Sequence, residues 1–290
     1  MENHILWEIK NRTKLDVSTF KVMGILNVTP DSFYDGKKYI DFDSAIAHAM
    51  KMAQQGADII DVGGESTRPG SPRISAEEEM KRVVPVISAL SKNIGLPLSC
   101  DTYKAEVAVK AIEAGASIIN DISAFSMDSR LFDVVKHYGC GYVLMHMQGT
   151  PANMQEHPFY KDVVGEVISF FHTHLKILKN KGLDINKIVI DPGIGFGKRL
   201  KDNLLLIRNL ERFQKLGRPV LIGTSRKSFI GNLLNGLPAE ERLEGSLASA
   251  VVAYMRAARI FRVHDVKETK RALHVAAAIE TEGYTELHST

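Results

Sequence analysis

One short stretch of the sequence constrains the fold more than any other, because an apolar run in it ends at an acidic residue. Residues 188–190 are Ile, Val and Ile, and Asp191, Pro192 and a loop with three glycines follow directly. Consecutive β-branched residues are typical of a parallel strand that is buried on both faces. Since a carboxylate cannot stay unpaired in such an interior, we expect Asp191 to lie where the strand opens into a cavity.

The loop after this strand, residues 193–198, would let a ligand approach its backbone, because glycines leave few side chains in the way. Its spacing does not match the dinucleotide motif, and Arg199 stands where a P-loop requires Ser or Thr. The simpler alternative is a tight loop in which Asp191 caps a local turn. Whether other strands end in the same way decides between the two interpretations.

The unit of strand, polar end and helix recurs along the whole chain. Residues 56–60 and 115–119 are near copies, which indicates a repeated element, and Ser75 with Glu78 forms a capping box before one helix. The predicted strands are residues 20–26, 57–62, 96–100, 116–119, 141–145, 188–190, 219–222 and 259–263. Helical spacing follows each strand, including one helix at 203–216 and a longer helical region that reaches about residue 258.

Eight such units without a linker favour an α/β fold, a closed (β/α)8 TIM barrel in a single domain over residues 1–290. We expect its core at about residues 20–280, after a polar lead-in, and a tail at residues 281–290. A doubly wound open sheet would also alternate strands with helices. The regular polar strand ends favour the barrel.

Composition and charge narrow the classes of partner. The formal net charge of +3 is too small to indicate a nucleic-acid-binding protein. No segment is long and apolar enough to cross a membrane, and the N-terminus lacks the apolar core of a signal peptide. Cys100 and Cys140 are the only cysteines and lack metal-ligand spacing, which suggests a reducing compartment. We expect a cytoplasmic protein.

Polar side chains stand at or just past the end of each of the eight predicted strands. They are Asn27, Asp61, Asp101, Asn120, His146, Asp191, Ser225, Lys227, Arg262 and His264. In a parallel barrel the carboxyl ends of all strands meet at one mouth, which is where active sites lie. Because barrel interiors are built from apolar layers, so many polar ends predict a ligand site.

The chemistry of this set suggests a flat heterocycle with donors and acceptors on its edge. Asp101, Asn120, Asp191 and Lys227 offer carboxylates, an amide and an ammonium, and a carboxylate can accept two hydrogen bonds from a guanidine-like edge. Asp101 or Asp191 could instead be a general base or a metal ligand. Arg262 could stack on the ring or hold an anion.

Positive charge around the same mouth suggests a phosphate group. It comes from Arg68, Lys198, Arg226, Arg262 and His264, and the loops after strands seven and eight of such barrels are common phosphate sites. Asn27 is a plausible oxygen ligand for Mg²⁺, which takes few protein ligands and is completed by phosphates and water. A structural histidine is the alternative for His264.

The motifs resemble those of the dihydropteroate synthase family. Residues 23–33 read MGILNVTPDSF and residues 61–70 read DVGGESTRPG, and both are long signatures of that family. Shorter matches are at residues 101–102, 119–121, 191–198, 223–228 and 262–266. The resemblance covers residues 20 to about 279, with no departure at any position that the family uses for chemistry.

The resemblance implies a transferase of folate biosynthesis, with Mg²⁺ as its cofactor, a homodimer built through the later helices, and sulfonamides as inhibitors. Such an enzyme joins 4-aminobenzoate to 6-hydroxymethyl-7,8-dihydropterin diphosphate. Carried over by motif, Asp101, Lys227 and Arg262 are catalytic, and the pterin is held by Asp101, Asn120, Met145, Asp191, Phe196, Gly223, Lys227 and Arg262. The diphosphate is taken by Asn27, Arg262 and His264, with Asn27 at the metal, and the aminobenzoate by Phe33, Thr67, Arg68, Pro69, Ser225 and Lys227.

Two other functions fit a barrel with a pterin slot. A methyltransferase that moves the methyl group of methyltetrahydrofolate to a corrinoid protein shares the central pterin motifs, but it does not need the first two loops. A non-catalytic pterin-binding paralogue would keep the slot and lose those loops. Residues 27–33 and 66–70 retain the loop motifs, which favours the synthase.

Overall fold

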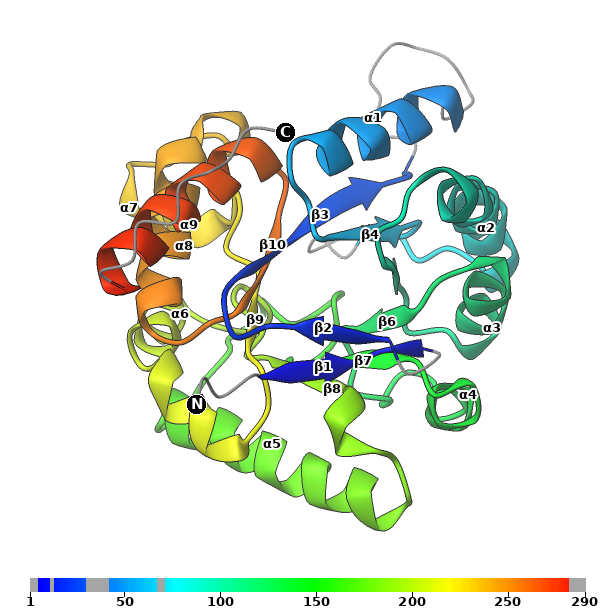
Figure 1. Cartoon of the computed structure of the whole chain (residues 1–290). Coiled ribbons are helices and arrows are strands. Elements are labelled where there is room, and N and C mark those ends of the chain that lie inside the picture. The colour runs from blue at the N-terminus through cyan, green and yellow to red at the C-terminus, as the bar shows by residue number, and fades with distance from the viewer. Residues whose placement is uncertain (1–4, 11–12, 30–41, 67–70, 282–290) are drawn as a thin grey trace.

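Eight parallel strands form the centre of the computed structural model, which describes residues 5–10, 13–29, 42–66 and 71–281 (Figure 1). The strands are β3 (Lys21–Asn27), β4 (Ile59–Gly63), β5 (Leu98–Asp101), β6 (Ile118–Asp121), β7 (Gly141–Met145), β8 (Ile188–Asp191), β9 (Leu221–Ile222) and β10 (Ile260–Val263). They pair in the order β8-β7-β6-β5-β4-β3-β10-β9. A parallel bridge between Ile190 and Val220 joins the two ends of this order, so the predicted TIM barrel is confirmed.

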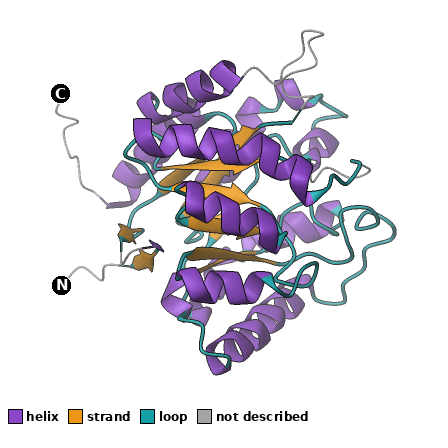
Figure 2. Ribbon diagram, turned by 90° about the vertical axis from the view of Figure 1, so that its right-hand side faces the viewer, coloured by secondary structure: helices purple, strands orange, loops and turns teal. Residues whose placement is uncertain are grey.

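Helices surround the barrel, as Figures 1 and 2 show from two directions. They are α1 (Phe42–Gln54), α2 (Ala76–Asn93), α3 (Ala105–Ala114), α4 (Leu131–Tyr138), α5 (Val163–Asn180), α6 (Leu200–Arg208), α7 (Ser228–Leu233), α8 (Leu243–Met255) and α9 (Val266–Thr281). Short 3-10 helices are η3 (Ile185–Lys187), η4 (Leu210–Leu216) and η5 (Ala239–Glu241). The hydroxyl of Ser75 accepts a hydrogen bond from the Glu78 amide at 3.1 Å, which is one half of the predicted capping box of α2. The Glu78 carboxylate accepts from Arg82 at 3.1 Å.

Two predicted helices are divided in the structure. The single helix expected at residues 203–216 is α6 followed by η4, and the long helical region before residue 258 is α7, η5 and α8. In the first case the division falls at Asn209, the C-cap of α6, whose side-chain amide also donates to the Leu205 carbonyl at 2.8 Å. In the second, residues 235–238 read Asn, Gly, Leu and Pro, which end a helix.

The segment before residue 20 is part of the core, although the core was predicted to begin at about residue 20. Strand β1 (Leu6–Glu8) pairs antiparallel with β2 (Lys14–Asp16), and this hairpin crosses one end of the barrel (Figure 1). Trp7 is fully buried and its indole nitrogen donates to the Lys187 carbonyl at 2.8 Å. The hairpin contributes Trp7, Ile9 and Val17 to one cluster with Met23, Ile59, Ile118, Val143, Val189, Leu221 and Ile260. These strand residues lie at or near the amino ends of their strands, so the hairpin seals the end opposite the mouth.

The described helices contain none that is long and apolar enough to span a membrane. Residues 282–290, which make up nearly all of the predicted tail, lie outside the described part of the chain.

Candidate active site

Arg262 is the centre of the polar groups at the mouth of the barrel. It stands on β10 and donates from Nε to Oδ2 of Asp61 at 2.6 Å and from Nη2 to Oδ2 of Asp101 at 2.7 Å. The amide of Asn120 donates to the same oxygen of Asp61 at 3.0 Å. One hydrogen-bonded group thus joins strands β4, β5, β6 and β10 and fixes the side chains that were predicted to hold a heterocycle.

Lys227 and Asp191 complete this set from the other side. Gly223 lies between the two groups of residues, since a Cβ there would be 3.8 Å from the Lys227 ammonium and 3.9 Å from the Cβ of Arg262. The ammonium also lies 4.7 Å from the centre of the Phe196 ring and donates to the Ile194 carbonyl. Asp191 accepts from the Gly193 amide at 2.7 Å. This contact is the local turn cap named above as the simpler alternative for Asp191. Its position where the strand opens into a cavity stays a prediction, since Asp191 is buried.

An apolar wall stands beside these polar groups. Met145 and Ile122 are buried, and Phe196 packs against them with part of its ring exposed. A flat ring in this position would contact hydrocarbon on one side and hydrogen-bonding groups at its edge, which is the usual construction of a small-molecule site.

Burial shifts the acid–base properties of the site. It raises the pKa of Asp101 to about 7, with Arg262 opposing the rise. It also raises the pKa of Asp191, against the attraction of Lys227, and lowers the pKa of the Lys227 ammonium to about 8. The interaction with two carboxylates keeps the pKa of Arg262 above its ordinary value, although burial acts against it. Titrating groups this close to neutrality are typical of functional sites.

The glycine loop approaches its neighbours too closely for any side chain at two positions. A Cβ on Gly193 would lie 2.0 Å from the His146 carbonyl oxygen, and one on Gly197 would lie 2.4 Å from that of Gln148. Both glycines also have positive φ, at 69° and 62°, which other residues adopt at a cost. The glycines therefore let the loops after β7 and β8 pack against each other.

Two of the predicted phosphate-binding cations are engaged elsewhere. Lys198 is buried and bonds to His146, and Arg226 forms an ion pair with Asp265 at 2.6 Å. The hydroxyl of Ser225 lies 3.1 Å from Nδ1 of His264, so these two predicted residues are neighbours at the mouth. Asn27 ends β3 beside Gly63, next to Asp101.

The predicted aminobenzoate residues Phe33, Thr67, Arg68 and Pro69 lie outside the described residues. The base of the second loop is described and is held by buried ions that the sequence analysis did not single out. Lys104 donates to Glu65 and, at 2.6 Å, to Glu79, and Tyr103 donates to Glu65 at 3.0 Å. Glu79 lies on the outer helix α2, so sequence spacing alone gave no signal for this contact.

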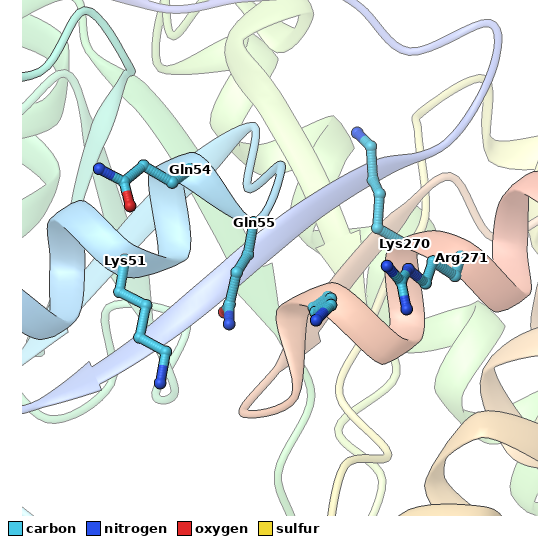
Figure 3. Close-up of a pocket in the computed structure, with 6 residues that line it drawn as sticks. Lys51, Gln54, Gln55, Lys270 and Arg271 are labelled. Atoms are coloured by element: carbon cyan, nitrogen blue, oxygen red, sulfur yellow. The ribbon is translucent and has the colours of Figure 1, made fainter. Parts of the chain in front are cut away.

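A hollow of about 460 Å³ outside the barrel is separate from this site (Figure 3). It lies between α1 and α9 and is lined by Lys51, Gln54, Gln55, Lys267, Lys270 and Arg271. Lys270 there pairs with Asp58 at 2.7 Å, just before β4 begins. The hollow therefore faces the amino ends of the strands, whereas the groups described above lie at their carboxyl ends.

The comparison with known proteins identifies the class to which the fold and the site belong. A family model described as pterin binding enzyme matches residues 23–264. Because this match spans most of the chain, the chain belongs to the pterin-binding enzyme family.

Within this family, the relatives are dihydropteroate synthases. The chain is 49% identical to that of Clostridium beijerinckii over 252 residues, which are 87% of this chain and 91% of the relative. The Yersinia pestis synthase with a sulfonamide drug complex has a TM-score of 0.89 and 44% identity and covers 94% of this chain and 98% of its own. The Xanthomonas albilineans synthase with 4-aminobenzoic acid has a TM-score of 0.90 and 42% identity, with coverages of 96% and 99%.

Proposed function

We infer that this chain acts as a dihydropteroate synthase, a transferase of folate biosynthesis. It joins 4-aminobenzoate to 6-hydroxymethyl-7,8-dihydropterin diphosphate and forms 7,8-dihydropteroate and diphosphate. The observation that carries this inference is the joining of Asp101, Asn120 and Arg262 into one hydrogen-bonded group at the mouth. This hydrogen-bonded group occurs in a chain whose sequence is 49% identical to that of a dihydropteroate synthase.

The site supports a dissociative displacement, in which the bond to the diphosphate breaks ahead of the formation of the new bond. The bond from the pterin methylene to the diphosphate oxygen breaks, the bond to the arylamine nitrogen forms, and the amine loses one proton. An arylamine is largely unprotonated at neutral pH, so no strong base is required. Catalysis is then mostly positioning and electrostatic stabilisation, and we assign Asp101, Asn120, Asp191 and Lys227 to the pterin edge and Arg262 to its face and to the diphosphate.

A diphosphate-release assay with and without 4-aminobenzoate tests the function. We expect release that depends on both substrates. A methyltransferase would not release diphosphate from the pterin substrate, and a non-catalytic paralogue would bind it without release; either result would overturn the inference. Sulfonamides should compete with 4-aminobenzoate, since a sulfonamide drug is in complex with the Yersinia pestis relative.

We also propose that Mg²⁺ binds at Asn27 together with the diphosphate. The described residues contain no group of three or more His, Cys, Asp or Glu side chains that could hold a metal, so substrate and water must supply most of its ligands, as Mg²⁺ prefers. The oxygen Oδ1 of Asn27 lies 3.8 Å from the position of a Cβ on Gly63, and this hard donor fits the ion. When bound, Mg²⁺ would neutralise charge on the leaving group. Diphosphate release that persists in excess chelator would contradict this proposal.

Finally, we propose a cytoplasmic homodimer. Apolar side chains on the later helices support the dimer, since Val252, Met255, Val275 and Ile279 are 45%, 57%, 62% and 71% exposed. The two buried free thiols support a reducing compartment. Light scattering of the purified protein should give twice the chain mass, and Met255→Glu should lower it; a monomeric wild type would refute the dimer.

A further inference from the structure

Lys198 is a buried lysine whose side-chain nitrogen contacts only neutral acceptors, and burial lowers its pKa to about 7. Lys198 is only 3% exposed. It takes part in none of the ion pairs found among the described residues. The ammonium instead bonds Nδ1 of His146 at 3.0 Å, the His146 carbonyl at 3.3 Å and the Phe196 carbonyl at 2.9 Å. An ammonium has three donors, so this environment uses each of them.

These bonds connect two walls of the pterin slot. His146 directly follows Met145 at the end of β7, and Phe196 lies in the glycine loop after β8. Burial and the Lys198 charge lower the pKa of His146 to about 2, so the imidazole is neutral and its Nδ1 accepts the proton of Lys198. Phe170 packs edge-on against the imidazole with ring centres 4.9 Å apart, which fixes the orientation of the acceptor.

Four successive carbonyls of the glycine loop accept hydrogen bonds from side chains. Gln155 bonds that of Gly195 at 2.8 Å, and Tyr160 bonds that of Gly197 at 2.9 Å. Lys227 bonds that of Ile194, and Lys198 bonds that of Phe196. The loop has few side chains with which to hold itself, because glycine is its main residue. Side chains from outside residues 194–197 therefore set its conformation.

We propose that Lys198 is a positioning residue for the pterin slot. It holds the Phe196 backbone against the loop after β7 and thereby places the Phe196 ring. The proposal rests on the proposed function and adds a residue that acts through Phe196. Phe196 packs with Met145 and Ile122 on one side of the slot. The Lys227 ammonium lies over its ring, 4.7 Å from the ring centre. A displaced Phe196 would thus disturb both the apolar wall and the cation assigned to the pterin edge.

The test compares Lys198→Met with Lys201→Met. Methionine keeps an unbranched stem and removes the donors, while Lys201 is an exposed lysine of α6 three positions along. We expect Lys198→Met to raise the KM for the pterin diphosphate by about tenfold or more, and the KM for 4-aminobenzoate by less than about twofold. Lys201→Met should change neither. Direct titration of the pterin diphosphate without 4-aminobenzoate should show the same loss of affinity.

A purely structural role would lower the melting temperature or the active fraction and leave the ratio of the two KM values unchanged, and that result would overturn the proposal. If Lys198→Met fails to fold, the ratio of the two KM values is measured for Lys198→Gln, whose side chain keeps two donors. Hydrogen exchange at the amides of residues 193–197 should speed up in either variant. If wild type itself released no diphosphate, the proposed function would fail, whereas a pterin affinity that is insensitive to Lys198 would refute only this inference.

Discussion

The guanidinium of Arg262 on β10 and the carboxylate of Asp61 on β4 form an ion pair past the intervening strand β3, with Nε 2.6 Å from Oδ2, although 201 residues separate them in the chain. Asp61 is fully buried, so bulk solvent cannot replace a lost partner of this carboxylate. It also accepts from Asn120 at 3.0 Å and therefore fixes two side chains assigned to the pterin. The pair connects the last strand of the barrel to the second.

Removing one partner of this pair should be costly for the fold. Asp61→Leu leaves Arg262 and Asn120 without their shared acceptor, and we expect the free energy of unfolding to fall by about 3–5 kcal/mol. Urea unfolding followed by circular dichroism measures this change. Glu77→Gln, which removes one partner of an exposed pair with Lys81, should have no measurable effect. Equal stability of the two variants would show that the Asp61–Arg262 pair does not stabilise the barrel.

Asp101 and Lys227 should be essential for turnover. Asp101→Asn keeps the shape of the side chain and removes the charge that would pair with the guanidine-like edge of the pterin, and Lys227→Ala removes the ammonium. Each should lower kcat/KM by about 10³ or more. Circular dichroism should show an intact fold in both variants. Activity like that of wild type in either one would rule out the assigned pterin slot.

The affinity for the pterin should depend on pH with a maximum between the two shifted pKa values. Asp101 must be ionised to accept from the pterin, and because burial raises its pKa to about 7, affinity should fall as the pH drops below that value. Lys227 must keep its proton, and because burial lowers its pKa to about 8, affinity should also fall above that value. Titrations of pterin binding from pH 5 to pH 10 test this prediction. A flat profile would contradict it.

Gly193→Ala and Gly217→Ala separate two costs of replacing glycine. The two residues have nearly equal φ angles of 69° and 66°, but a Cβ on Gly193 would meet the His146 carbonyl at 2.0 Å, while one on Gly217 meets nothing within 4 Å. Gly217→Ala should therefore lower the free energy of unfolding by only about 1–2 kcal/mol, the cost of a left-handed backbone for a residue other than glycine. Gly193→Ala must also push apart the loops after β7 and β8, so its loss of unfolding free energy and its loss of pterin affinity should both be larger. Similar results for the two variants would exclude a close approach at Gly193.

The N-terminal hairpin should contribute strongly to stability. Trp7→Ala removes a fully buried indole from the closed end of the barrel, and substitutions of this kind cost about 3–5 kcal/mol. Leu6, its neighbour on β1, is 39% exposed, and Leu6→Ala should cost much less. Thermal unfolding by circular dichroism compares them. A Trp7→Ala variant as stable as Leu6→Ala would mean that the hairpin does not seal the barrel.

Much of the site was predictable because a parallel barrel brings strand ends together whatever the loops do. Asp101, Asn120, Asp191, Lys227 and Arg262 were predicted from their positions after apolar runs, and they lie in one mouth. Asp61 was noted at a strand end but had no role, because its importance depends on Arg262 and Asn120, which reach it from other strands. Lys198 was expected to face an anion and is buried against His146.

The sequence by itself determined the order of strands and helices and the residue types that meet at the mouth, because hydrophobic periodicity and the spacing of polar ends are local properties. Only the tertiary structure decided which polar groups pair with each other and which remain for a ligand. Those pairings join residues from separate strands and loops, and their geometry is fixed by the packing of the whole barrel. For the same reason the hairpin around Trp7 could be assigned to the core only after the closed end of the barrel was known, since its few apolar residues gain their stability from strands far along the chain.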